Sequence, residues 1–161
     1  MKFFAKERIK GGIMNEKRFQ EIVQFTIEKE IRAFDFYTTA GQMAKYSGMK
    51  ELFLELAKEE EGHRKLLENL SIEKVTQSRI ETIPDLKISD YLVETEFRPD
   101  MSYAEILRMA MKMEEHSLKL DNDLKDSSTD EGIKNLFTFL AGEEAKHKLR
   151  LEKIYDEEIL K

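Results

Sequence analysis

Two short Glu-x-x-His motifs give the sequence its clearest potential for chemistry. The first pairs Glu60 with His63, and the second pairs Glu144 with His147. Residues three apart lie on one face of a helix, so each motif presents a carboxylate and an imidazole at the same level. Oxygen ligands with one imidazole per ion suit iron or manganese. The sequence has no cysteine, which excludes disulfides and sites that bind zinc or iron–sulfur clusters through thiolates.

Two further glutamates also fall in apolar helical stripes. Glu30 follows Ile27 at helical spacing, and Glu114 follows Ala110 in the same way. A buried carboxylate is costly unless it is paired, hydrogen-bonded or bound to a metal. Because two divalent cations would cancel the charge of four carboxylates, the pattern predicts a dinuclear metal site.

The helices that must position these residues form two related hairpins. One offset of 84 residues maps Glu30 onto Glu114 and the first Glu-x-x-His motif onto the second, and it aligns residues 52–63 with residues 136–147. We infer a duplicated helical hairpin and therefore a pseudo-two-fold axis. Apolar residues recur at helical spacing through both hairpins, with expected turns at 47–48 and 126–130.

The order of these segments predicts an all-α fold. Hairpins at 15–75 and 102–159 form an antiparallel four-helix bundle that occupies residues 15–161, joined by one long crossover at 76–101. Ser102 and Glu105 have the spacing of a capping box at the start of the third helix. Residues 1–14 are predicted to be a flexible N-terminal tail, with a true translation start at Met14 as the alternative.

The two motifs, Glu30 and Glu114 make the sequence resemble the ferritin-like di-iron carboxylate superfamily. Within it the chain is similar to the rubrerythrin-like branch, over about residues 15–158. The resemblance implies a ferritin-like bundle that holds two iron ions, with manganese or a mixed pair as alternatives. It also implies bridging glutamates and terminal glutamate–histidine pairs. The implied bridges are Glu60 and Glu144, and the implied terminal pairs are Glu30 with His63 and Glu114 with His147.

Two other side chains are candidates for contacts with these ligands. Tyr37, two turns after Glu30, resembles a family tyrosine that hydrogen-bonds near the ions. Asp121 falls on the inward face of its helix, where we expect it to accept a hydrogen bond from a histidine ring. The neighbouring Glu59 and Glu143 are expected to be solvated.

The resemblance implies an oxidoreductase that reduces peroxide or dioxygen. Since the chain has no cysteine centre, its electrons would come from an external donor such as rubredoxin. One alternative is an iron-binding storage or detoxification protein of the ferroxidase type, which the lack of a predicted cage-forming fifth helix disfavours. Further alternatives are a manganese catalase-like enzyme and a metal-free structural bundle.

Charge and hydropathy limit the partners and the location. The chain of 161 residues has a net charge of −6, which argues against a uniformly basic nucleic-acid-binding surface. No run of about 18 apolar residues could span a membrane, and the N-terminus has no apolar signal segment. We therefore expect a cytoplasmic protein without nucleic-acid or membrane partners, and the family resemblance implies a homodimer.

Overall fold

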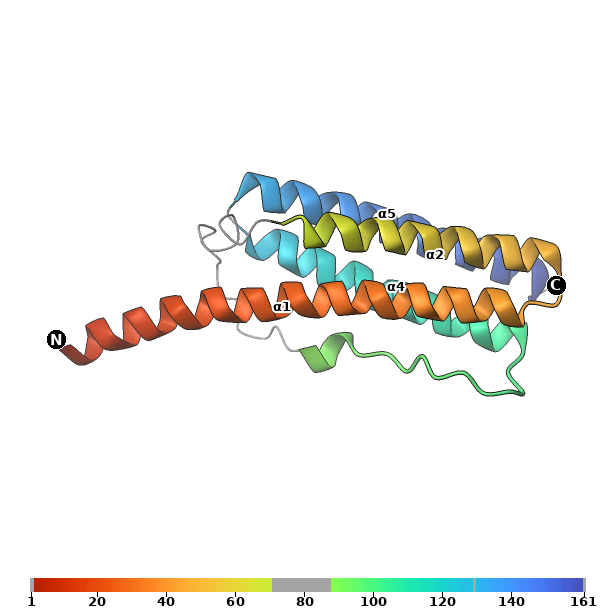
Figure 1. Ribbon diagram of the computed structural model, residues 1–161, viewed down its shortest axis with the longest axis horizontal. Coiled ribbons are helices and arrows are strands. Elements are labelled where there is room, and N and C mark those ends of the chain that lie inside the picture. Colours follow the sequence, from red (N-terminus) through yellow and green to blue (C-terminus); the bar gives the residue numbers. More distant parts are fainter. Residues whose placement is uncertain (1, 71–87, 129, 161) are drawn as a thin grey trace.

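The structure is a computed structural model that describes residues 2–70, 88–128 and 130–160. Within these ranges, four long helices lie side by side (Figure 1). They are α1 (Lys2–Met43), α2 (Ser47–Glu68), α4 (Tyr103–Ser127) and α5 (Glu131–Glu158), with a short 3-10 helix η1 (Ile88–Tyr91) in the crossover. One antiparallel hairpin consists of α1 and α2 and the other of α4 and α5, and the two pack together. The predicted all-α four-helix bundle is confirmed.

The turn of the first hairpin is short and lies slightly earlier than predicted. It covers residues 44–46, because α2 already begins at Ser47. Tyr46 has an extended backbone, with φ −121° and ψ 145°, and so precedes the helix rather than continuing α1. The two helices approach closely beside this turn, since a Cβ atom on Gly41 would lie 3.2 Å from Cδ2 of Leu54.

Side-chain caps fix where the second hairpin's helices begin. The predicted capping box at α4 is confirmed: the Glu105 N–H donates to Ser102 Oγ at 3.2 Å, and the Ser102 N–H donates to Glu105 Oε2 at 2.7 Å. At α5, Asp130 accepts a hydrogen bond of 2.9 Å from the backbone of Ile133. These bonds satisfy amide groups that the first turn of a helix leaves without partners.

The described part of the crossover runs along α1 and α4 and reaches the far end of the bundle, where α4 begins (Figure 1). The hydroxyl of Tyr91 in η1 donates to Asp123 of α4 at 2.6 Å. Farther along, the ring of Phe97 lies 4.8 Å from that of Phe36 in α1. The earlier part of the predicted crossover, at residues 76–87, lies outside the described residues.

Helix α1 begins well before the other helices and extends past them at one end of the bundle (Figure 1). It therefore includes residues 2–14, which the sequence analysis assigned to a flexible tail. The flexibility of this segment stays a prediction.

Two apolar layers fill the bundle, one toward each end. The first surrounds Tyr37, Phe53 and Leu107, and the second surrounds Leu120 and Phe137. Along every long helix, a buried charged segment separates the residues of one layer from those of the other. The bundle therefore holds a polar layer between two apolar ones, and this layer contains the six residues that the sequence analysis selected as metal ligands.

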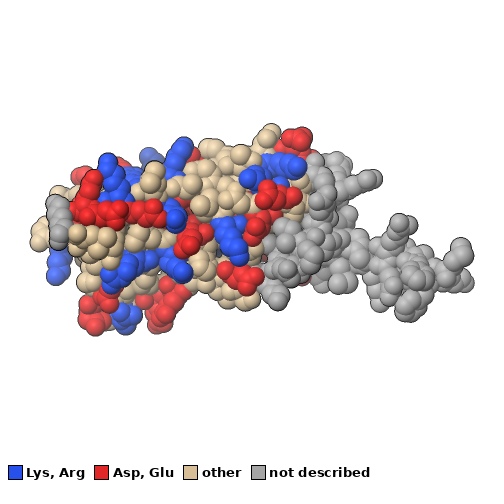
Figure 2. Space-filling view, turned by 180° about the vertical axis from the view of Figure 1, so that it is seen from behind, with Lys and Arg blue, Asp and Glu red and all other residues tan. Residues whose placement is uncertain are grey.

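The outer surface carries charge of both signs. Figure 2 shows acidic and basic side chains interspersed over the described part of one face, without a broad region of one sign. Among the described residues, no helix combines the length and the apolar character needed to cross a lipid bilayer.

Candidate metal centre

The six predicted ligand side chains meet in the polar layer of the bundle. All are buried, and none is more than 4% exposed. They form two overlapping groups, in each of which the candidate ligand atoms lie within 4.8 Å of one another. One group consists of Glu30, Glu60, His63 and Glu144, and the other of Glu60, Glu114, Glu144 and His147. Glu60 and Glu144 belong to both groups, so their carboxylates lie between the two positions.

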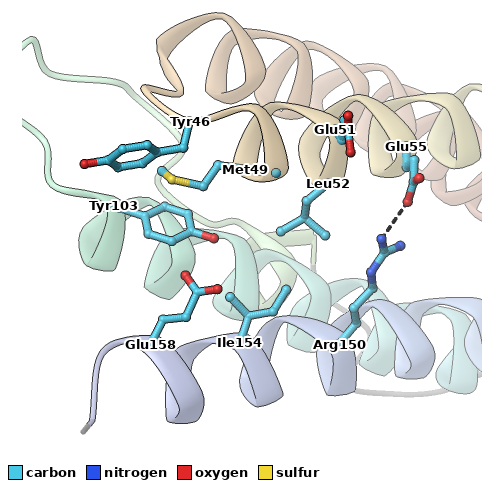
Figure 3. A pocket seen from close by; sticks show the side chains of 10 residues that line it. Tyr46, Met49, Glu51, Leu52, Glu55, Tyr103, Arg150, Ile154 and Glu158 are labelled. Atoms are coloured by element: carbon cyan, nitrogen blue, oxygen red, sulfur yellow. Dashed lines mark hydrogen bonds and ion pairs between the residues drawn. The ribbon is translucent and has the colours of Figure 1, made fainter.

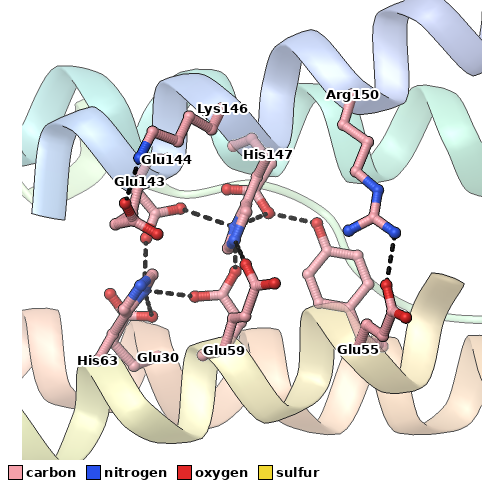
Figure 4. Close-up of polar contacts among 12 residues, drawn as sticks. Glu30, Glu55, Glu59, His63, Glu143, Glu144, Lys146, His147 and Arg150 are labelled. Atoms are coloured by element: carbon pink, nitrogen blue, oxygen red, sulfur yellow. Dashed lines mark hydrogen bonds and ion pairs between the residues drawn. The ribbon is translucent and has the colours of Figure 1, made fainter.

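Both histidines turn the same ring atom toward these shared carboxylates (Figure 4). His63 Nδ1 lies 3.1 Å from Glu60 Oε2 and 3.1 Å from Glu144 Oε1. His147 Nδ1 lies 3.1 Å from Glu60 Oε1. The two rings lie 5.6 Å apart with nearly parallel planes. The Glu-x-x-His motif of α2 thus faces the motif of α5.

Each group also has one glutamate of its own from the other two helices. Glu30 Oε2 lies 3.8 Å from His63 Nδ1, and Glu114 Oε1 lies 3.5 Å from His147 Nδ1. Neither oxygen of Glu30 nor Oε2 of Glu114 has a hydrogen-bond partner among the described residues. Buried carboxylate oxygens rarely stay unsatisfied. Carboxylate oxygens that lack a hydrogen bond and lie beside imidazole nitrogens therefore fit a pair of divalent cations.

Without metal ions, protons must balance this cluster of carboxylates. Burial raises the pKa of Glu60 to about 8, and the charges of Glu144 and Glu30 add to the shift. Burial and the charge of Glu114 raise the pKa of Glu144 well above its usual range. Burial alone would lower the pKa of His147, but its contacts with Glu114 and Glu60 outweigh this effect and raise it to about 12. Metal ions would compete with these protons for the same atoms.

Tyr37 lies where the sequence analysis expected it, against the cluster. Its side chain is fully buried, and its hydroxyl donates a hydrogen bond to Glu114 Oε1. Burial and the charge of Glu114 raise the pKa of Tyr37 well above its usual range, so the phenol stays protonated and remains a donor.

Asp121 is buried beside the cluster, but the expected hydrogen bond to a histidine ring is absent among the described residues. Its Oδ1 atom instead lies 3.8 Å from Nζ of Lys29, which also lies 3.8 Å from Glu30 Oε1. The sequence analysis missed Lys29. A signal was present, because Lys29 falls at helical spacing between Phe25 and Phe36, both of which are buried.

Lys29 and Glu30 hold opposite charges in contact. Burial alone would lower the pKa of Lys29, but the carboxylates of Asp121 and Glu30 outweigh it and raise the pKa. Burial alone would raise the pKa of Glu30, but the ammonium of Lys29 and the nearby ring of His63 lower it to about 2. Glu30 is therefore ionised near neutral pH in the metal-free cluster, unlike Glu60 and Glu144.

Glu59 contacts the cluster from its solvent side, although it was expected to be only solvated. Its Oε2 atom lies 2.5 Å from Nε2 of His147, and its side chain is 43% exposed (Figure 4). Glu143 occupies the corresponding place in the other hairpin, yet it pairs with Lys146 at 2.8 Å. Only a tertiary structure reveals the contact of Glu59, since it joins α2 to α5.

The family model for rubrerythrin matches residues 21–155 of the chain. The chain belongs to the rubrerythrin family. The matched residues of this rubrerythrin-family chain include all six side chains of the two groups. A solved structure, "Hypothetical Protein Pfu-1136390-001" from Pyrococcus furiosus, is similar to it, with a TM-score of 0.71 and 26% sequence identity. That similarity covers 86% of this chain and 88% of the other. A comparison with curated proteins finds no match.

A separate pocket of about 490 Å³ lies between the start of α2 and the end of α5 in this rubrerythrin-family bundle (Figure 3). An ion pair of 2.6 Å between Glu55 and Arg150 borders it, beside Tyr103 and Ile154. None of the six side chains of the candidate metal centre lines this pocket.

Proposed function

We propose that this rubrerythrin-family protein is a di-iron oxidoreductase that reduces peroxide, with dioxygen as the alternative oxidant. The overlap of the two groups at Glu60 and Glu144 carries the proposal, because shared carboxylates suit two ions held close together. A bound pair of ferrous ions supplies the two electrons with which hydrogen peroxide and two protons become two molecules of water. The proposal is consistent with the family to which the chain belongs.

Each side chain of the cluster has a task in this proposal. The four glutamates would balance the charge of two divalent ions, and Nδ1 of each histidine would bind one ion. The Nε2–H of His147 donates to Glu59, which fixes the orientation of the ring. Since Glu59 is partly exposed, this pair also connects the cluster to solvent, from which the consumed protons can be replaced. Tyr37 holds Glu114 in place through its hydroxyl.

Reduction of the oxidised centre requires electrons from another protein. The chain contains no cysteine and so cannot hold a cysteine-bound iron centre of its own. We propose an external donor such as rubredoxin, and a homodimer as the assembled form. The donor is tested by mixing the oxidised protein with reduced rubredoxin and following its reduction. The homodimer is tested by measuring the mass of the protein by sedimentation.

The test of the oxidant compares two reactions of the same ferrous protein. Protein loaded anaerobically with iron is mixed with hydrogen peroxide or with air-saturated buffer, and the oxidation is followed by absorbance. We expect faster oxidation by peroxide. Glu60→Gln should abolish the reaction, because it removes a carboxylate that both groups share. Glu61→Gln is the matched control, since Glu61 is the next residue of the same helix and pairs with Arg64 instead of a residue of the cluster.

Other outcomes would favour the other candidate functions. Oxidation that is no faster with peroxide than with air would contradict peroxide reduction. Many irons per chain in a large assembly would indicate iron storage. Oxygen release from peroxide by manganese-loaded protein would indicate a catalase-like enzyme. A folded chain that binds no metal would be a structural bundle.

A further inference from the structure

The internal repeat predicts matching contacts on the two sides of the cluster, but the structure does not have them. The offset of 84 residues that maps Glu30 onto Glu114 also maps Tyr37 onto Asp121. Tyr37 donates a hydrogen bond to Glu114. The symmetric bond would run from residue 121 to Glu30, yet neither the oxygens of Asp121 nor those of Glu30 have a hydrogen-bond partner among the described residues. Glu30 therefore lacks the tyrosine that Glu114 has.

Lys29 lies beside Glu30 instead of a tyrosine, although Lys29 does not correspond to Tyr37 in the repeat. Its Nζ atom lies 3.8 Å from Glu30 Oε1 and 3.8 Å from Asp121 Oδ1, and its side chain is only 8% exposed. The residue that corresponds to Lys29 in the other hairpin is Met113, which is buried and uncharged. One side of the cluster thus has a neutral phenol, whereas the other has an ammonium and a carboxylate.

We propose that Lys29 and Asp121 form a buried positioning pair that holds Glu30 and makes the two metal positions unequal. The ammonium of Lys29 repels a cation at the position of Glu30 and His63, and it competes with that cation for the Glu30 carboxylate. No such charge faces the position of Glu114 and His147 among the described residues. The first ion therefore binds at the Glu114 position, and the position beside Lys29 is the weaker one. This inference depends on the metal binding proposed above.

The surroundings of Lys29 support a specific role rather than chance burial. Lys29 lines a pocket of about 140 Å³ between α1, α4 and the crossover, together with Ser117 and Tyr91. A lysine at its position could extend into this pocket and toward solvent, which is where long charged side chains usually end. Its ammonium instead lies among carboxylates at the side of the cluster.

The test measures each position separately with Co²⁺, whose visible spectrum reports ligation. His63→Gln leaves the Glu114–His147 position to be titrated, and His147→Gln leaves the Glu30–His63 position. We expect Co²⁺ to bind at least about tenfold more tightly to the first variant than to the second. Adding Lys29→Met to both variants should reduce this ratio by at least about threefold, because the repulsion at the Glu30 position is removed while the contact of Glu59 with His147 still favours the other position.

Two further variants separate the inference from a general loss of structure. Asp121→Asn leaves Lys29 without its second carboxylate and should weaken Co²⁺ binding at the Glu30 position, opposite to the effect of Lys29→Met. Misfolding would weaken binding in both variants. The double variant K29M/D121Y rebuilds the symmetric tyrosine and should reduce the ratio at least as much as Lys29→Met does. Lys112→Met, which removes an exposed lysine of α4, should change neither position.

Melting of the metal-free chains is a second readout that needs no metal. Lys29→Met should melt well below wild type, because Glu30 and Asp121 lose the buried cation beside them, and K29M/D121Y should recover most of this loss. An unchanged Co²⁺ ratio, or a double variant no more stable than the single one, would overturn the inference. If wild type bound no metal, the proposed function would fail, whereas these melting curves would still decide whether the pair exists.

Discussion

His147 Nε2 lies 2.5 Å from Oε2 of Glu59, a carboxylate on the facing helix α2 that is partly open to solvent. The opposite ring atom of His147, Nδ1, faces the shared carboxylates of the cluster. In the proposed centre, Glu59 would thus select which nitrogen of His147 is left to bind a metal ion. The contact is asymmetric, because Glu143 at the corresponding position of the other hairpin pairs with Lys146.

Replacing Glu59 should therefore weaken metal binding without touching a ligand. We expect Glu59→Gln to lower the affinity for Co²⁺ by about 10- to 100-fold, the usual effect of losing the carboxylate that orients a ligand histidine. Glu143→Gln is the matched control and should change the affinity much less. Equal effects of the two substitutions, measured by titration, would contradict the role assigned to Glu59.

Removing the hydroxyl of Tyr37 should destabilise the protein. Tyr37→Phe keeps the ring that packs on Phe53 but takes away the donor to Glu114. The cost should be about 1–3 kcal/mol of unfolding free energy, since a buried acceptor loses its partner. Urea unfolding measures it. Tyr155→Phe removes a hydroxyl that accepts a surface hydrogen bond from Arg108 and should cost less than about 0.5 kcal/mol.

The stability of the metal-free protein should fall as the pH rises from 6 to 9. The pKa of Glu60 is raised to about 8 and that of His147 to about 12, so the folded state keeps protons that the unfolded chain releases near 4.5 and 6.5. These protons contribute fully to the stability at pH values below the pKa values of the unfolded chain. The contribution is lost as the pH rises through the pKa values of the folded state. Each retained proton gives a slope of about 1.4 kcal/mol per pH unit.

Thermal melting at several pH values checks this slope. The metal-loaded protein should lack it, because ions replace the protons, so the difference in melting temperature between the loaded and metal-free forms should grow with pH. Glu60→Gln, which imitates a permanently protonated Glu60, should flatten the slope of the metal-free protein. A metal-free chain that gains stability between pH 6 and 9 would contradict the proton balance described for the cluster.

Chelation should lower the melting temperature of the loaded protein. Metal at about 1,000 times its dissociation constant stabilises a folded protein by about 4 kcal/mol, which corresponds to about 10 °C for a domain of this size. Calorimetry with and without a chelator measures the shift. A melting temperature that the chelator leaves unchanged in freshly purified, metal-containing protein would mean that the cluster binds no ion tightly.

Local sequence patterns were sufficient to predict the bundle and to select the six cluster residues. They were not sufficient to predict the side chains that contact those six. Glu30, Glu60 and Glu144 could be found because each interrupts an apolar stripe of its own helix. Glu59 could not, because on its own helix it is a half-exposed residue, and its partner lies 88 residues away in α5.

The contact between Lys29 and Asp121 was harder to predict from the sequence. A lysine next to a predicted ligand is normally solvated, and the packing of α1 against α4 brings its ammonium beside Asp121. Asp121 was correctly expected to point inward, but its partner was wrong, since Lys29 rather than a histidine faces it. In both cases the chemistry depends on contacts between helices, which the spacing within one helix does not define.

Anaerobic titration of the wild-type chain with ferrous iron, with the bound iron counted per folded chain, decides whether the two overlapping groups hold a pair of ions. We predict two iron ions per chain in wild type. We predict a clear loss of binding in Glu60→Gln but not in Glu61→Gln. A folded wild-type chain that binds one ion or none, or that binds iron equally well with and without the Glu60 carboxylate, would contradict the dinuclear centre.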